Sequence, residues 1–213
     1  MNRPTLMLVT DPAYAPNEGW PTFLSGLVEA GVTAVQVRDK HAAGRPLAEL
    51  VRSIRAVLKP HGVPVLVNDR IDVAWSAGAD GVHLGQDDLP LEDARRWLGG
   101  DAVIGWSVDD AAQLQHPSIE AATYVAASPV FATPSKSDAG PPLGLDGIRR
   151  LRNRYDGWLL GIGGISADNA AEARQAGLDG VAVISAILGA PAPRQAAAAL
   201  RRAIDGPAAS PSR

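Results

Sequence analysis

Short apolar runs of three to five residues alternate with helix-like segments along the whole sequence. Runs this short, separated by helices, predict parallel strands in βαβ units. Residues 47–58 carry apolar side chains close to the 3.6-residue helical period, and the alanine-rich segments 167–176 and 194–204 also favour helices. The predicted strands are Leu6–Val9, Ala34–Val37, Val65–Val67, Gly81–Leu84, Val103–Gly105, Tyr124–Ala126, Leu159–Ile162 and Gly180–Ile184.

A phrase built on Ala-Gly recurs before three of these strands, at Glu29–Val35, Ser76–Val82 and Gln175–Val181. In each copy the glycine can end a helix in the left-handed conformation, and a strand begins shortly afterwards. A doubly wound sheet would use the same phrase, but eight strands favour a (β/α)8 TIM barrel near the low end of its size range. We therefore expect one barrel domain over residues 1–205 and a flexible tail at 206–213.

Composition narrows the classes of function. The net charge of −3 provides no basic field for nucleic acid, and no apolar stretch is long enough to span a membrane. The absence of cysteine excludes a disulfide scaffold, a thiolate nucleophile and cysteine-bound metal, and the four scattered histidines do not suggest zinc or haem. The apolar run at the start is too short for a signal peptide, so a cytoplasmic protein is expected.

A basic motif, Gln36-Val-Arg-Asp-Lys40, follows the second predicted strand. Because side chains alternate along a strand, Gln36, Arg38 and Lys40 share one face. Two cations on one face of a barrel strand predict a multiply charged anion at the barrel mouth. A strand end with solvated charges is the alternative, and it fits Lys40 better than Arg38.

Asp69 and Asp88 follow the third and fourth predicted strands, which are neighbours in a barrel. One or two carboxylates, completed by substrate phosphates and water, are the usual ligands of Mg²⁺. Asp69 could instead cap a helix that starts at Arg70. Capping explains Asp88 less well, because Pro90 at the first helical position would make Leu89 the cap.

Ser107 and His83, on the fifth and fourth predicted strands, have structural interpretations. Ser107 can donate to an anion, but its spacing to Asp110 resembles a helix-capping pair, and spacing alone favours the cap. His83 has no partner at ligand spacing and is expected to be a satisfied core histidine.

The longest irregular segment, residues 128–143, follows the sixth predicted strand. Thr133, Ser135 and Lys136 place two hydroxyls and a cation on it, as in a lid or binding loop, and a solvated linker is the alternative. The segment Gly161–Ile165 and a helix after Ser185 follow strands seven and eight, where these barrels usually bind phosphate.

The motifs taken together resemble the thiamine phosphate synthase family, in family order across residues 8–187. Two departures are Ser128, where the family has glycine, and Ser135, where it has threonine. The motifs are Leu8-Val-Thr-Asp11, Gln36-Val-Arg-Asp-Lys40, Asn68-Asp69-Arg70, Gly81–Pro90, Gly105-Trp-Ser107, Pro129–Phe131, Thr133–Lys136, Gly163–Ile165 and Val183–Ile187.

The resemblance implies a (β/α)8 barrel enzyme that joins hydroxymethylpyrimidine diphosphate to a thiazole phosphate, or its carboxylate, and releases pyrophosphate. It assigns Mg²⁺ to Asp69 and Asp88, with Arg38, Lys40, Ser107 and Lys136 as catalytic residues. Two alternatives stay open: a thiazole tautomerase-like isomerase, and a barrel that binds thiamine intermediates without catalysis. The implied pyrimidine diphosphate ligands are Gln36, Arg38, Lys40, Asn68, Ser107 and Lys136. The implied thiazole phosphate ligands are Thr133, Ser135, Gly164, Ile184 and Ser185.

Overall fold

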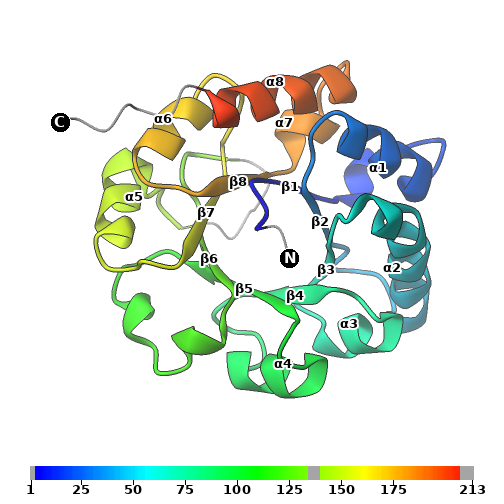
Figure 1. Ribbon diagram of the computed structural model, residues 1–213, viewed down its shortest axis with the longest axis horizontal. Helices are drawn as coiled ribbons and strands as arrows, with labels where there is room; N and C mark the ends of the chain where they lie inside the picture. Colours follow the sequence, from blue (N-terminus) through cyan, green and yellow to red (C-terminus); the bar gives the residue numbers. More distant parts are fainter. Residues whose placement is uncertain (1–2, 134–139, 207–213) are drawn as a thin grey trace.

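Eight parallel strands close into a barrel in chain order (Figure 1). The structure is a computed structural model, and it describes residues 3–133 and 140–206. Each strand pairs with the next along the chain, and β8 pairs with β1 to close the circle. The (β/α)8 barrel expected from the sequence is therefore confirmed. The strands are β1 Leu6–Val9, β2 Ala34–Val37, β3 Val65–Asn68, β4 Gly81–Leu84, β5 Val103–Val108, β6 Tyr124–Ala127, β7 Trp158–Ile162 and β8 Gly180–Val183.

Helices surround the barrel and cover the outer faces of the strands (Figure 1). Two short 3-10 helices, Gln113–Gln115 and Ile119–Ala121, stand between β5 and β6, where the other connections between described strands carry an α-helix. None of the helices within the described ranges is long and apolar enough to cross a membrane. The helices are α1 Trp20–Glu29, α2 Gly44–Leu58, α3 Ile71–Ala77, α4 Leu91–Leu98, α5 Gly144–Arg152, α6 Ala170–Gln175, α7 Ser185–Leu188 and α8 Pro193–Asp205.

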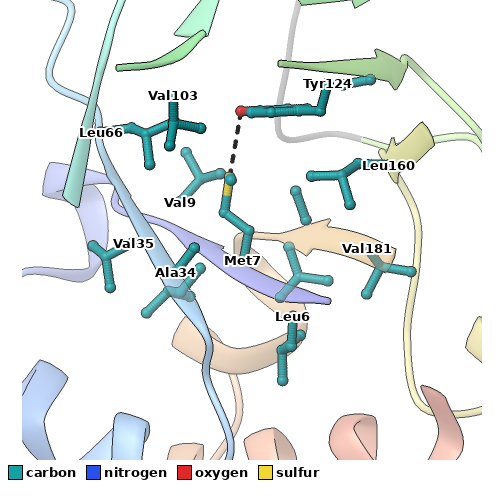
Figure 2. Packing of buried hydrophobic residues seen from close by; sticks show 14 of the residues in the cluster. Leu6, Met7, Val9, Ala34, Val35, Leu66, Val103, Tyr124, Leu160 and Val181 are labelled. Carbon is teal, nitrogen blue, oxygen red and sulfur yellow. Dashed lines mark hydrogen bonds between the residues drawn. The ribbon is translucent and has the colours of Figure 1, made fainter. Parts of the chain in front are cut away.

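The strands are buried on both faces because helices cover one face and the barrel interior receives the other. Met7 and Tyr124 meet near the centre of the barrel, as Figure 2 shows. Glycines of the repeated Ala-Gly phrase have positive φ angles of 111° at Gly31, 64° at Gly78 and 125° at Gly177. These conformations, which favour glycine, confirm that the phrase ends a helix before a strand.

The amino-terminal end of the barrel carries a hydrogen-bonding pattern that repeats at every second strand. The residue just before each even-numbered strand reaches the preceding odd-numbered strand, and its side-chain oxygen accepts a backbone N–H there. We call these four residues the latch residues. They are Thr33, bonded to the Leu6 amide at 2.9 Å, Asp80 to Val65 at 2.9 Å, Thr123 to Ile104 at 3.0 Å, and Asp179 to Leu159 at 2.8 Å.

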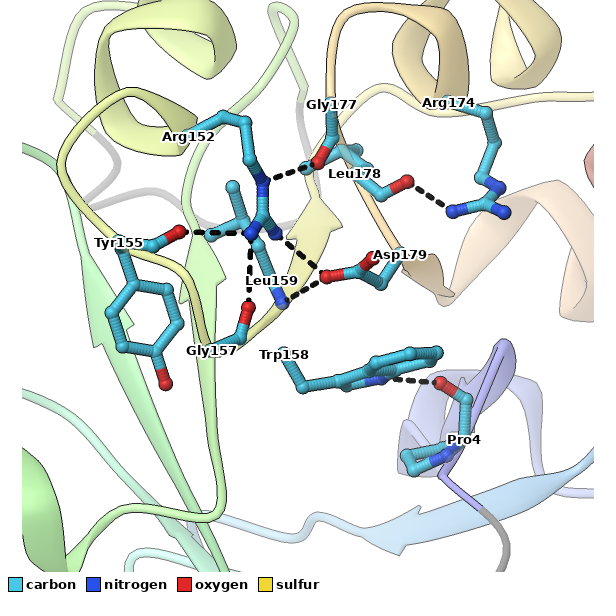
Figure 3. Close-up of polar contacts among 10 residues, drawn as sticks. All are labelled: Pro4, Arg152, Tyr155, Gly157, Trp158, Leu159, Arg174, Gly177, Leu178 and Asp179. Atoms are coloured by element: carbon cyan, nitrogen blue, oxygen red, sulfur yellow. Dashed lines mark hydrogen bonds and ion pairs between the residues drawn. The ribbon is translucent and has the colours of Figure 1, made fainter. Parts of the chain in front are cut away.

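Arginines from α2, α4 and α5 bond directly to latch residues, and an arginine from α8 bonds to the residue just before β1. Arg152 illustrates the arrangement in Figure 3, where its guanidinium donates to Asp179 at 2.6 Å and to the carbonyl of Gly177 at 2.9 Å. These polar contacts lie at the end of the barrel opposite the carboxyl ends of the strands. The other three arginines are Arg55, bonded to Asp80, Arg95, bonded to Thr123, and Arg201, bonded to Thr5 beside β1.

Candidate active site

The carboxyl ends of the strands surround two adjoining hollows that share Ile162, Ala182 and Ile184. The first lies in the barrel mouth, is lined by residues of all eight strands, and is called here the mouth hollow. The second lies over β7 and β8 and is called here the rim hollow. Both hollows are lined by site residues predicted from the sequence, and Ile184 lines both. Gln36, Arg38, Asn68 and Ser107 line the mouth hollow, and Thr133, Gly164, Ile184 and Ser185 line the rim hollow.

Arg38 is anchored at the mouth hollow by its own backbone. Its N–H donates to the Thr10 hydroxyl at 2.9 Å, and that hydroxyl donates to the Arg38 carbonyl at 3.2 Å. The guanidinium lies 3.9 Å from the Asp11 carboxylate, and the side chain is only 13% exposed. A largely buried guanidinium at this place offers a planar fork of donors to an anion.

Asp69 occupies a strained backbone position, with a φ of +63°. A non-glycine residue is uncommon in this conformation, which places the side chain beside Asp88. The capping alternative for Asp69 is wrong: α3 begins at Ile71, and Arg70 precedes it. Near Asp88, the sequence predicted a helix starting at Pro90 with Leu89 as its N-cap, whereas α4 begins at Leu91 and Pro90 is its N-cap.

The environment of Asp69 raises its pKa to about 6. Burial is the largest cause, followed by the charge of Asp88 and a hydrogen bond between the two carboxyls. Lys40 and Arg38 act in the opposite direction, so both cations lie close enough to influence the pair. Asp88 is itself held in place, because its Oδ2 accepts the Gly85 N–H at 2.7 Å.

The Asp69–Asp88 pair has the donor set of a divalent cation site. No group of three or more His, Cys, Asp or Glu side chains with metal-binding geometry occurs in the described residues. Two carboxylates suffice for Mg²⁺, whose remaining ligands are commonly substrate phosphates and water. Two facing carboxyls, one with a raised pKa, are a pair that a cation would stabilise.

His83, Ser107 and Tyr124 form a buried chain of hydrogen bonds beside the mouth hollow. His83 Nε2 lies 2.9 Å from Ser107 Oγ, and His83 Nδ1 lies 2.9 Å from the Tyr124 hydroxyl. The capping interpretation of Ser107 is wrong, because β5 continues to Val108 and the hydroxyl faces His83. His83 is a satisfied buried histidine, as expected, yet it also lines the mouth hollow.

The rim hollow is formed by glycine backbone and the start of α7. Gly164 has a φ of +64°, and a Cβ built there would lie 2.6 Å from the Ala132 carbonyl. The backbone can therefore approach closely only because residue 164 is glycine. Helix α7 begins at Ser185, as the sequence indicated, so its first amides face the hollow.

Two predicted residues, Ser135 and Lys136, lie outside the described residues. Sequence reasoning missed Thr10 and Tyr124 as parts of the site. Thr10 has a detectable signal, because it precedes Asp11 at the end of the first strand. Tyr124 stands at the start of β6, and only the three-dimensional contacts bring its hydroxyl to His83.

Comparisons with known proteins identify relatives over nearly the whole chain. The family model described as thiamine monophosphate synthase matches residues 6–187. A thiamine-phosphate synthase of Xanthobacter autotrophicus is 44% identical over 94% of this chain and 95% of its own length. One of Albidiferax ferrireducens is 43% identical, over 94% of this chain and 91% of the relative.

Solved structures give the same result for the fold. A thiamine phosphate pyrophosphorylase from Pyrococcus furiosus superposes with a TM-score of 0.85 at 34% identity, covering 94% of this chain and 95% of the other. A structure from Bacteroides thetaiotaomicron, 15% identical with a TM-score of 0.69, supports the barrel fold alone.

Proposed function

The chain belongs to the thiamine monophosphate synthase family, and from this premise we propose how its site serves the two substrates. The protein is a transferase that joins hydroxymethylpyrimidine diphosphate to a thiazole phosphate, giving thiamine phosphate and pyrophosphate. The proposal concerns the residues and the metal. Its main support is the concentration of charge at the barrel mouth, where Arg38 and Lys40 act on the paired carboxyls of Asp69 and Asp88.

The diphosphate of the pyrimidine substrate is assigned to the mouth hollow. Arg38 and Lys40 bind its oxygens, and Gln36, Asn68 and Ser107 hold the remainder of the substrate. The resemblance adds Lys136 to this set. Arg38 favours a bidentate contact because its guanidinium is a planar fork of donors, and the Thr10 hydroxyl holds the backbone from which the side chain extends.

Asp69 and Asp88 are assigned as Mg²⁺ ligands. A bound Mg²⁺ supplies positive charge to the diphosphate oxygens, which makes pyrophosphate a better leaving group. Asp69 would hold the ion as a carboxylate, the form that predominates above its pKa of about 6, and the Gly85 amide would keep Asp88 in place beside it.

The bond that breaks joins the pyrimidine methylene carbon to the diphosphate oxygen, and the electron pair leaves with pyrophosphate. The carbon becomes a cation stabilised by the pyrimidine ring. Arg38, Lys40 and Lys136 stabilise the negative charge that grows on the leaving group. The thiazole nitrogen then donates its electron pair to the cation, forming the new C–N bond, so that much of the catalysis is positioning.

The thiazole phosphate is assigned to the rim hollow. Backbone N–H groups near Gly164 and at the start of α7 bind the phosphate, with the hydroxyls of Thr133 and Ser185. Ile184 contributes to both hollows and lies between the two substrates. Ser135 belongs to this set by resemblance alone.

Incubation of the purified protein with both substrates tests the whole proposal. We expect pyrophosphate and thiamine phosphate in equal amounts, lost in excess chelator and restored by added Mg²⁺. A tautomerase-like isomerase or a non-catalytic barrel would release no pyrophosphate. Full activity in excess chelator would refute the metal assignment while leaving the reaction intact.

The reaction is further assigned to the cytoplasm. Both substrates carry phosphate charges, which cross a lipid bilayer only at high energetic cost. Fractionation of cells that express the protein tests this assignment, which fails if the activity is found outside the cytoplasmic fraction.

A further inference from the structure

The hydrogen-bond chain beside the mouth hollow has two possible directions. His83 is bonded through both ring nitrogens, with Tyr124 at Nδ1 and Ser107 at Nε2, each at 2.9 Å. A neutral imidazole carries one proton, on one of these two nitrogens. The position of this proton decides whether the Ser107 hydroxyl accepts a hydrogen bond from the ring or donates one to it.

The acceptors around the Tyr124 hydroxyl favour one direction. Its proton can go to His83 Nδ1 at 2.9 Å or to the thioether sulfur of Met7 at 3.8 Å (Figure 2). An unprotonated imidazole nitrogen is a strong acceptor, whereas a thioether is a weak one. The amide nitrogen of Gln36 donates to the same Met7 sulfur at 3.6 Å, and the Gln36 side chain also contacts Tyr124.

Burial keeps the Tyr124 hydroxyl protonated. Tyr124 is 1% exposed, and its burial raises its pKa well above the usual value of a tyrosine. The phenol therefore keeps the proton that it donates. With Nδ1 accepting that proton, the imidazole proton of His83 is on Nε2 and points to Ser107 Oγ.

The backbone is shaped to allow this contact. Gly105 lies directly against the two rings, and a Cβ there would come within 2.3 Å of the Tyr124 hydroxyl and 2.4 Å of His83 Nδ1. The rings are nearly parallel, with centroids 5.6 Å apart and an interplanar angle of 25°. Any larger residue at position 105 would force the pair apart.

We propose that Tyr124 is a positioning residue that, through His83, holds Ser107 as a hydrogen-bond donor to the diphosphate. Since the Ser107 oxygen accepts from His83 Nε2–H, its own proton is directed elsewhere, and the mouth hollow is the space that it faces. Diphosphate oxygens are acceptors only, so a serine held as a donor suits them. The inference rests on the proposed function for Ser107, and its first test uses no substrate.

The first test measures the tautomer of His83 by two-bond ¹H–¹⁵N correlation on the full-length, substrate-free protein labelled in histidine. Separate substitutions of His41, His61 and His116 assign the His83 signals by elimination and leave the site intact. We expect Nε2 to carry the proton, with Nδ1 showing the shift of an acceptor. A proton on Nδ1 would overturn the proposal, whether or not the protein releases pyrophosphate.

The matched variants are Tyr124→Phe, which deletes the hydroxyl, and Tyr155→Phe, which deletes a hydroxyl near Gly157, away from the site. Tyr124→Phe should move the ¹⁵N shifts of His83 toward a mixture of tautomers, and Tyr155→Phe should leave them unchanged. Unchanged His83 shifts in Tyr124→Phe would also overturn the proposal.

The second test is a double-mutant cycle with Ser107→Ala, measured as kcat/KM for the pyrimidine diphosphate. Tyr124→Phe should lower kcat/KM by roughly 10-fold, the size expected for a weakened hydrogen bond to a charged group. In the Ser107→Ala background the same substitution should have little effect, because the donor is already gone. Equal losses in both backgrounds would refute action through Ser107, whereas an inactive wild-type protein would refute the proposed function instead.

Discussion

The affinity of the free enzyme for Mg²⁺ should fall as the pH is lowered through about 6. Asp69 is protonated below its pKa of about 6, and its proton must leave before the carboxylate can bind the ion. The raised pKa places this dependence near neutral pH, whereas an aspartate with the usual pKa of 3.8 would show it only in acid. The affinity for Mg²⁺ should therefore be lower in acid and constant above neutral pH.

The magnitude follows from the ionised fraction of one group with this pKa. The fraction is close to one at about pH 8, one half at about pH 6 and roughly one eleventh at about pH 5. The apparent dissociation constant should rise about tenfold from about pH 8 to about pH 5. Binding at about pH 6 should release about half a proton per ion, against almost none at about pH 8.

Isothermal titration calorimetry with MgCl₂ alone, in two buffers of different ionisation enthalpy, measures both quantities. Asp87→Asn is the matched control, because Asp87 is an exposed neighbour of Asp88 and should leave the pH profile unchanged. Asp88→Asn should abolish binding. An affinity that stays constant across this pH range, or proton release that is absent at about pH 6, would refute the assignment of Asp69.

Three further predictions concern the rim hollow, the latch residues and Lys136 in the segment 128–143. Gly164→Ala should raise KM for the thiazole phosphate about tenfold or more, whereas Arg38→Ala should mainly raise KM for the pyrimidine diphosphate. Steady-state kinetics in which both variants raise KM for the same substrate alone would contradict two separate sites. Asp179→Ala should lower the free energy of unfolding by about 2 kcal/mol in urea denaturation, since it leaves a strand amide and a guanidinium without their acceptor. The control Asp146→Ala removes an exposed ion pair and should cost under about 0.5 kcal/mol, and equal costs would contradict a stabilising role of the latch residue. Lys136→Ala should reduce turnover more than pyrimidine diphosphate binding, because its charge matters most as the leaving group forms, and wild-type turnover in single-turnover assays would exclude this role.

The barrel was predictable because its signals are local and repeated. Short apolar runs define strands at nearly their observed bounds, and glycines such as Gly78 end helices where the phrase places them. The bounds of β5 are less accurate, since Val103–Gly105 was expected and the strand extends to Val108. Gly105 and Ser107 interrupt the apolar run in sequence, while backbone pairing with β6 keeps residues 106–108 in the sheet.

The site was predictable where neighbouring strands bring their ends together, as at Asp69 and Asp88. The contacts of Tyr124 with His83 were not, because they depend on ring orientation across the barrel and on the space left by Gly105. The strained backbone of Asp69 was also hidden, since aspartate commonly caps helices and nothing in the sequence marks a positive φ. The sequence therefore predicted which residues lie at neighbouring strand ends, whereas contacts across the barrel could be found only from the three-dimensional fold.

The latch residues give the barrel a cyclic order that the linear chain hides. Each latch joins an odd strand to the following even strand, and each supporting arginine comes from the helix before that odd strand. The last arginine, Arg201, reaches the latch residue Thr33 only indirectly: it donates to the Thr5 hydroxyl, and the Thr5 N–H donates to Thr33 at 3.0 Å. In terms of bonding, the molecule is a ring of four two-stranded modules, and the chain ends lie at one of the four junctions between modules. A circularly permuted chain opened at another junction would retain all four latches, with the substrate hollows at the opposite end of the barrel undisturbed.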